Sequence, residues 1–189
     1  MTTSFSELIR RRISTRAFLD TPVSETDVRD LLDTARWAAS GGNVQPWQVH
    51  VVAGEARQRV IDAVHERLEA DPFGDENDFG AYPKSLWDPY RSRRHALGEQ
   101  MYETMGIARE DKAARLNQVL QNFEFFGAPV GLFFSIDTRM NPNQWGHLGM
   151  FIMSVMLAAE EKGLATCAQE AWMTRCKTIA ATLGLDETQ

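Results

Sequence analysis

The chain has 189 residues, 43% hydrophobic and 24% charged, which is enough for one well-buried core and excludes a largely disordered chain. The formal net charge of -6 disfavours a nucleic-acid binder, because affinity for a phosphate backbone depends on a basic surface. Cys167 and Cys176 form no Cys-x-x-Cys pair, and no metal-ligand spacing occurs, so we expect a reducing compartment and no metal site. Apolar stretches fall short of a membrane span, and we predict a cytoplasmic protein with a single domain over residues 1–189.

The N-terminal third of the sequence contains the signals of two helices, a strand and a third helix. Ser4 and Glu7 have the spacing of a capping box, which starts the first helix, and Ser24 repeats the signal for the second. Apolar residues at helical spacing continue the second helix until the Gly41-Gly42 pair ends it. The predicted ranges are 5 to 11 or 12 and 28–42 for these helices, 47–53 for a valine-rich strand and 60–68 for the third helix.

An aromatic loop and a second set of elements follow. Residues 71–90 place prolines and glycines among aromatic side chains, a composition too apolar for a disordered linker, so we expect an ordered loop that covers a site. Pro129 marks the start of a buried strand, and Gly163 and Gly184 are placed to terminate helices. The predicted ranges are 94–105 and 110–126 for two helices, 130–136 for the strand, 148–159 for an apolar helix, 164–168 for a short strand and 174–183 for the last helix.

Three polar side chains lie at alternate positions where the chain leaves its first helix. In extended backbone, alternate side chains point to the same side, so Arg12, Ser14 and Arg16 would face one ligand together. This arrangement suits a phosphate, which accepts charge-assisted hydrogen bonds worth about 1.5–3 kcal/mol each. The alternative is that arginines at the end of a helix only complement the helix dipole.

A second polar motif, Ser-Gly-Gly-Asn-Val-Gln-Pro-Trp, occupies residues 40–47. Its glycines permit a close backbone approach, and Pro46 predicts an extended conformation for Gln45. The carboxamides of Asn43 and Gln45 each offer a donor and an acceptor, which match the edge of a heterocycle or a hydroxyl group. The alternative interpretation is a turn held by a buried Trp47.

A third motif, Gly-Leu-Ala-Thr-Cys-Ala-Gln-Glu, follows the predicted helix end at Gly163 and offers backbone amides to a ligand. In this order, Arg-x-Ser-x-Arg-x-Phe, Asn-x-Gln-Pro-Trp and the third motif resemble the nitroreductase family over nearly the whole chain. Within that family, residues 82–94 resemble the group that includes the nitrobenzoate reductases.

The resemblance implies an α+β fold with a mixed central sheet flanked by helices, and a domain-swapped homodimer with FMN at the subunit interface. It implies that Arg12 and Ser14 meet the FMN phosphate, and that Arg16 lies where negative charge accumulates on the reduced flavin. Asn122, or alternatively Gln121, is expected at the pyrimidine edge. The implied cofactor-binding residues are Arg12, Ile13, Ser14, Arg16, Ala39, Ser40, Gly41, Asn43, Gln45, Asn122, Gln169, Glu170 and Ala171, of which Ser40, Asn43 and Gln45 would come from the partner subunit.

The resemblance also implies an FMN-dependent NAD(P)H nitroreductase, with NADH or NADPH as electron donor and a small aromatic acceptor, in a ping-pong reaction. The chemistry would take place at flavin N5, next to the backbone at Glu170 and Ala171, so no catalytic side chain is expected. Aromatic side chains would wall a flat slot for the acceptor, and an arginine would pair with a substrate carboxylate, unless these arginines only solvate a helix face. The residues expected at the acceptor are Arg91, Arg94, Phe123 and Phe126.

The family pattern normally continues, beyond the position of Gln189, into a Gly-rich strand and a basic tail, so we expect this C-terminal strand and tail to be missing here. Without a basic tail, FMN would be held less tightly. Two further interpretations stay open. One is a related flavoprotein dehydrogenase or dehalogenase with the same cofactor site, and the other is a non-catalytic flavin-binding module.

Overall fold

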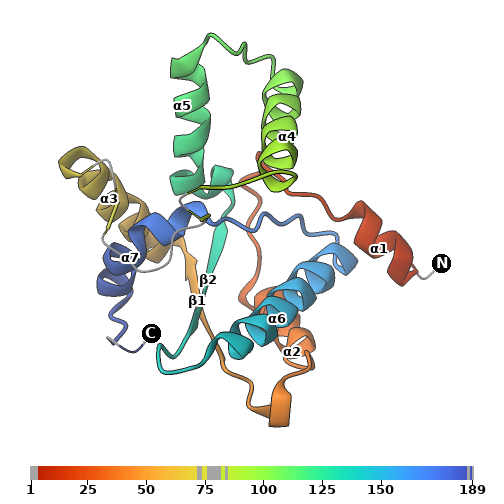
Figure 1. Ribbon diagram of the computed structural model, residues 1–189. Helices are drawn as coiled ribbons and strands as arrows, with labels where there is room; N and C mark the ends of the chain where they lie inside the picture. Colours follow the sequence, from red (N-terminus) through yellow and green to blue (C-terminus); the bar gives the residue numbers. More distant parts are fainter. Residues whose placement is uncertain (1–3, 72–73, 76–81, 84, 187, 189) are drawn as a thin grey trace.

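A two-stranded antiparallel ribbon separates two groups of helices (Figure 1). The computed structural model describes residues 4–71, 74–75, 82–83, 85–186 and 188. The strands are β1 Trp47–Ala53 and β2 Val130–Ile136. The α-helices are α1 Phe5–Arg11, α2 Glu25–Ala35, α3 Gly54–Ala70, α4 Tyr90–Thr104, α5 Lys112–Leu120, α6 Pro142–Glu161 and α7 Cys176–Leu183, and the short 3-10 helices are η1 Gly41–Asn43, η2 Gln121–Gly127 and η3 Ala171–Arg175. This helix-rich α+β architecture is the predicted fold class.

The ribbon places side chains into two apolar clusters, one on each face. β1 and β2 pair from Trp47↔Ile136 to Ala53↔Val130. Successive side chains of a strand point to opposite faces, so Val52 packs with α3 and α7, whereas Trp47 packs with α2 and α6. The Trp47 ring stacks on Phe151 of α6, with ring centroids 4.6 Å apart. The ribbon therefore supports both helix groups at once.

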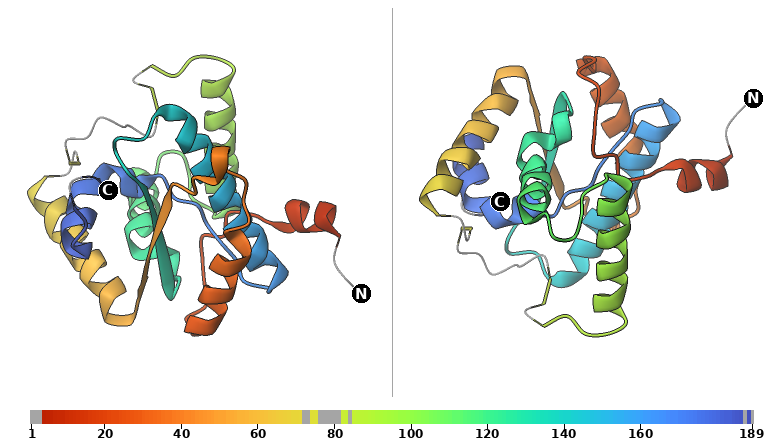
Figure 2. Two further views of the ribbon diagram at one scale, coloured as in Figure 1. Left: turned by 90° about the horizontal axis from the view of Figure 1, so that it is seen from below. Right: turned by 90° about the horizontal axis from the view of Figure 1, so that it is seen from above.

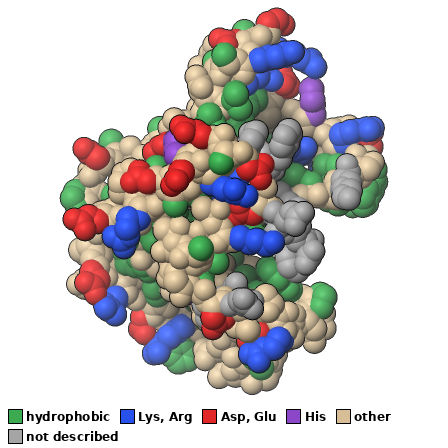
Figure 3. Space-filling view, turned by 90° about the vertical axis from the view of Figure 1, so that its left-hand side faces the viewer, with side chains coloured by type: hydrophobic (Ala, Val, Ile, Leu, Met, Phe, Trp, Pro, Cys, Tyr) green, Lys and Arg blue, Asp and Glu red, His purple; other side chains and the backbone are tan. Residues whose placement is uncertain are grey.

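The helices cover the two faces because each has an apolar stripe. α3 buries Val60, Ile61 and Val64, and each such aliphatic side chain stabilises the fold by about 1.5–3 kcal/mol. α6 buries Phe151 and Val155 against the other face of the ribbon. On the side of the molecule where α3 lies, acidic and basic side chains are interspersed (Figure 3). No described helix is long and apolar enough to cross a membrane.

Two parts project from this body. α4 and α5 stand side by side above it, joined by the Arg115 guanidinium, which donates to both carboxylate oxygens of Glu99 at 2.7 and 3.0 Å (Figure 1). α1 extends away from the body at the other side (Figure 2) and buries none of its residues. An ion pair of 3.1 Å between Arg11 and Glu160 ties it to the end of α6. The projecting elements thus expose surfaces that the body does not cover.

Several sequence predictions are confirmed. The capping box at Ser4 and Glu7 is present, and α1 has one of the two predicted ends. Both strands have the predicted bounds. Gly163 and Gly184 have φ values of 74° and 68°, the left-handed conformation predicted after a helix end.

Other predictions of secondary structure are wrong. The helix predicted for residues 110–126 ends at Leu120 and continues as the irregular η2, in which Phe125 and Phe126 have φ values of 52° and 53°. The second helix ends at Ala35 rather than before Asn43, and the helix predicted from residue 94 begins at Tyr90. The last predicted helix is divided into η3 and α7. These errors lie at helix ends, the part of a helix that an apolar pattern defines least well.

The mixed central sheet is also corrected for the described residues. The paired strands there are the antiparallel β1 and β2, and the strand predicted at residues 164–168 makes only one parallel bridge, between Ser14 and Thr166. We predicted an ordered aromatic loop at residues 71–90. Two of its aromatic residues, Phe73 and Phe79, lie outside the described residues.

Candidate functional site

The segment that follows α1 lies against the chain after α6. Ser14 forms the parallel bridge with Thr166, and the Thr15 amide donates to the Thr166 carbonyl at 3.0 Å. This pairing makes the segment extended, which the alternation of Arg12, Ser14 and Arg16 requires. These three residues are partly buried, while the intervening Ile13 is 67% exposed. The first and third motifs of the sequence are thereby brought together.

Two arginines of this segment provide positive charge at one place. Burial raises the pKa of the Cys167 thiol, and the nearby guanidinium groups of Arg16 and Arg12 partly oppose that rise. Arg16 Nη1 donates to the Ser14 carbonyl at 3.3 Å. Arg12 Nε is buried and has no hydrogen-bond partner among the described residues. Because a buried donor without a partner costs about 1–3 kcal/mol, the segment fits an anionic ligand that would accept from it.

A network of carboxamides lies close to Arg16. Gln169 Nε2 donates to the Asn122 carbonyl at 2.9 Å and to Asn122 Oδ1 at 3.1 Å. Gln169 Oε1 in turn accepts from Trp172 Nε1 at 3.2 Å, and Asn122 Nδ2 donates to the Val119 carbonyl at 2.8 Å. The orientation of each amide is therefore defined by its partners. Gln121, the alternative for the pyrimidine edge, is exposed.

A cavity of about 50 Å³ lies between these groups and the projecting helices. Arg16, Asn122 and Phe126 form part of its lining. The rest comes from residues that the sequence did not single out, which are Met101 and Tyr102 of α4 and Gln118 and Val119 of α5. A cation, a carboxamide and an aromatic ring thus meet in one place, under the α4–α5 pair. These four residues carry no motif in the sequence, and they are recognised only because the fold places α4 and α5 beside η2.

The second motif forms a tight turn around η1. The Gln45 amide donates to Ser40 Oγ at 2.9 Å, and Gln45 Nε2 donates to the Arg36 carbonyl at 3.3 Å. The predicted extended conformation of Gln45 is wrong, because these two bonds hold it at φ 48°. Asn43 has φ 55° and is exposed, as are Ala39 and Gly41.

This turn is far from the arginines of the same chain. Gly41 contacts His147 near the start of α6, whereas Arg11 pairs with Glu160 at its end. An α-helix rises about 1.5 Å per residue, so the two places are separated by roughly 20 Å along α6. Figure 1 shows η1 at the lower end of the ribbon and the chain that follows α1 at the upper end. One protomer therefore does not place both motifs around the same small ligand.

The residues expected at the acceptor have different surroundings. Arg91 pairs with Asp88 at 2.7 Å, and the Arg94 guanidinium lies 4.4 Å from the centroid of the Tyr82 ring. Phe123 is 6% exposed and lies edge-on to Trp172 in the apolar core, so its ring does not line the cavity. Phe126 is equally buried but does line it. Glu170 is exposed at the start of η3, and its carbonyl accepts from the Met173 amide.

The donors and acceptors that the α+β fold brings together here are of the kind that suits a planar heterocycle carrying a phosphate. The site offers guanidinium and hydroxyl donors at one end, oriented carboxamides and an aromatic wall at the other, and no group of metal-ligating side chains occurs among the described residues.

The chain belongs to the nitroreductase family, whose model matches residues 9–189. It is 38% identical over 183 residues to a nitrobenzene nitroreductase of Ectopseudomonas oleovorans, with 97% of this chain and 81% of the relative covered. It is 36% identical to a 4-nitrobenzoate reductase of Pseudomonas putida, with 100% of this chain and 82% of the relative covered. The family that the three motifs indicated is thus confirmed.

Solved structures agree with this assignment. The crystal structure of the FMN- and NADPH-dependent nitroreductase NfnB from Sphigopyxis sp. strain HMH has a TM-score of 0.95 and 46% identity, with 98% of this chain and 83% of that chain covered. The FMN-dependent nitroreductase NfnB from Mycobacterium smegmatis, solved with NADPH, has a TM-score of 0.88 and 30% identity, with 96% and 81% covered.

Proposed function

We propose that this chain is an FMN-dependent NAD(P)H nitroreductase that reduces small nitroaromatic compounds. The observation that carries the proposal is that Arg16 and Asn122 line one cavity, while Ser14 and Arg12 lie next to Thr166 and Cys167, in the same segment as Gln169, the partner of Asn122. Relatives at 36–38% identity are nitroreductases of nitrobenzene and 4-nitrobenzoate, which favours the same class of acceptor. We place the enzyme in the cytoplasm, as a single domain.

The residues of the site would hold FMN by its two ends. Arg12 and Ser14 bind the phosphate, for which the buried Arg12 Nε is a free donor in the described part of the chain. Arg16 and Asn122 line the cavity and bind the pyrimidine edge, where a guanidinium stabilises negative charge. Bound FMN supplies the two-electron carrier between the nicotinamide and the acceptor. Gln169 orients Asn122, and Phe126 excludes water from the cavity.

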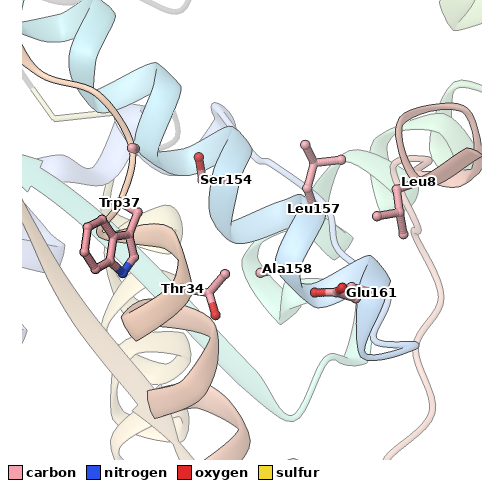
Figure 4. A pocket seen from close by; sticks show the side chains of 8 residues that line it. Leu8, Thr34, Trp37, Ser154, Leu157, Ala158 and Glu161 are labelled. Carbon is pink, nitrogen blue, oxygen red and sulfur yellow. The ribbon is translucent and has the colours of Figure 1, made fainter. Parts of the chain in front are cut away.

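A homodimer would complete this site. α1 exposes Phe5 at 66% and Ile9 at 41%, and Trp37, just after α2, is 82% exposed. An apolar groove of about 290 Å³ lies between α1, α2 and α6, lined by Leu8, Thr34, Trp37, Ala38, Ser154, Leu157, Ala158 and Glu161 (Figure 4). Such surfaces are typical of interfaces. We infer that two protomers associate through these surfaces as the domain-swapped homodimer that the family resemblance implies, and that Ser40, Gly41, Asn43 and Gln45 approach the partner's FMN.

The acceptor would lie under the α4–α5 pair, where Tyr102 and Val119 form the wall of the cavity together with Phe126. Arg94 stacks on Tyr82 at the surface, and Arg91 already pairs with Asp88. Arg94 is therefore the better partner for a substrate carboxylate, because Arg91 would first have to break its ion pair.

The decisive experiment is reconstitution with FMN followed by anaerobic reduction. We expect the purified protein to become yellow with FMN, to bleach with NADPH or NADH, and to regain its colour on addition of nitrobenzene or 4-nitrobenzoate. The Ser14→Ala, Arg16→Ala double variant serves as the matched control and should stay colourless after dialysis. A protein that binds FMN but does not bleach would be a flavin-binding module, and one that binds no FMN would refute the proposal.

A further inference from the structure

The turn around η1 has a strained backbone. Asn43 and Gln45, neither of them glycine, have φ values of 55° and 48°. Such conformations cost about 1–3 kcal/mol each and persist only where the surroundings hold them. Within the turn, Ser40 Oγ and the Arg36 carbonyl accept hydrogen bonds from Gln45. Gly41, on the other side of the turn, is instead contacted by a residue that lies outside the turn.

That outside contact comes from α6. The Gly41 amide donates to His147 Nε2 at 3.4 Å, and a Cβ added at Gly41 would lie 3.2 Å from His147 Cε1. The imidazole ring therefore lies directly on the backbone of Gly41. His147 Nδ1 is 3.0 Å from Gln144 Oε1, and both residues lie on one face of α6 because they are three positions apart.

The Gln144 contact defines the role of each ring nitrogen. A carboxamide oxygen only accepts hydrogen bonds, so Nδ1 carries the proton in the neutral ring. Nε2 then has a free lone pair, which the Gly41 amide requires. Gln144 thus selects the tautomer that His147 needs to accept from Gly41.

We infer that His147, oriented by Gln144, is a positioning residue for cofactor binding: it holds the η1 turn in the conformation in which Ser40, Asn43 and Gln45 reach the FMN of the partner subunit. This inference rests on the proposed function for the ligand, but the contact between His147 and Gly41 is a property of the chain itself. The sequence predicts a structural or exposed role for His147 but not its contact with Gly41, because the two residues are far apart in the chain.

The first test measures the turn without FMN. Hydrogen–deuterium exchange of residues 40–45 is compared in the wild type, His147→Leu and His147→Gln, with His65→Gln on α3 as the control. Gln reaches about as far as the imidazole Nε2 and offers an acceptor oxygen. We expect faster exchange in His147→Leu and nearly wild-type exchange in His147→Gln and the control. Equal exchange in the wild type and His147→Leu would overturn the inference.

The second test measures FMN affinity by quenching of flavin fluorescence. Loss of one hydrogen bond predicts a Kd raised about three- to ten-fold in His147→Leu, with most of the affinity kept in His147→Gln. Equal losses in both variants would overturn the role of the acceptor. If the amide exchange of residues 40–45 is as expected but the wild type binds no FMN, the proposed function is refuted. The contact of His147 with the turn would then remain, but its role in cofactor binding would be overturned.

A double-mutant cycle tests the close contact itself. Gly41→Ala should speed the hydrogen–deuterium exchange of residues 42–45 without FMN when His147 is present, because the new methyl group meets the ring at 3.2 Å. In a His147→Ala background the same substitution should change the exchange much less, since the ring is gone. Independent, additive effects of the two substitutions would show that the residues are not coupled and would overturn the inference.

Discussion

Gln169→Leu should lower both the stability of the protein and its affinity for FMN. The side chain links three parts of the fold: it donates twice to Asn122 of η2 and accepts from Trp172 of η3. Leucine has a similar volume but forms none of these hydrogen bonds. Trp172 is 6% exposed, so its indole N–H would lose its acceptor in a place with little access to water.

The magnitude follows from these contacts. The stranded donor of Trp172 costs about 1–3 kcal/mol, and the two bonds to the partly buried Asn122 contribute less, since water replaces part of them. We expect a loss of about 2–3 kcal/mol in the free energy of unfolding. For a chain of this size, 1 kcal/mol lowers Tm by about 2–4 °C, so the expected decrease in Tm is roughly 4–12 °C.

Thermal unfolding followed by circular dichroism, together with FMN titration, measures both effects. Gln169→Glu separates the contacts, because a carboxylate still accepts from Trp172 but cannot donate to Asn122. We expect its FMN affinity to fall with that of Gln169→Leu, since both release Asn122, and its Tm to decrease as well, because the carboxylate faces two acceptor oxygens of Asn122. A Tm within 1 °C of the wild type, with unchanged FMN affinity for both variants, would refute the assigned role of the network.

Three further predictions address the arginine segment, the core and a surface carboxylate. Arg12→Met should raise the Kd for FMN about ten- to a hundred-fold at unchanged circular dichroism, since it removes charged donors worth about 1.5–3 kcal/mol; an unchanged Kd would place the phosphate elsewhere. Gly131→Ala should destabilise the protein by about 1–3 kcal/mol in urea titrations, because its Cβ would lie 2.3 Å from Phe125 Cε1; wild-type stability would contradict this packing. Hydrogen bonds from Arg139 lower the pKa of Asp137 from 3.8 to about 2, so its stabilising effect is complete above 3.8 and is lost as the pH falls through about 2. Asp137→Asn should therefore show a smaller decrease in stability over that pH range, and an identical acid profile would count against the pair.

The sequence predicted the elements whose signals are local. The cap at Ser4 and the strand Trp47–Ala53 depend on neighbouring residues and on alternation, both of which can be read along the chain. The strand Val130–Ile136 was predicted with equal success because Pro129 marks its start. The three motifs likewise indicated the family, since their order and residue types can be recognised in the sequence without the tertiary structure.

The failures have tertiary causes. The helix predicted to reach residue 126 ends early because Phe125 turns its ring onto Gly131 of β2, which requires a left-handed backbone at the end of η2. Proline at 46 favours an extended Gln45, but two hydrogen bonds within the turn outweigh that local preference. Phe123 is aromatic and close to Asn122 in sequence, yet its ring points into the core, which the spacing alone does not reveal.

The positions of the motifs also connect cofactor binding to association. α6 separates the arginine segment from the η1 turn by roughly 20 Å, so neither motif can complete the site of its own chain. In the proposed dimer, each FMN contacts both protomers and therefore binds the dimer more tightly than the monomer. By mass action, FMN then stabilises the dimer as much as dimerisation strengthens FMN binding. A substitution in the apolar groove at Leu157 of α6, which is not among the proposed flavin-binding residues, would weaken FMN binding through the monomer–dimer equilibrium alone.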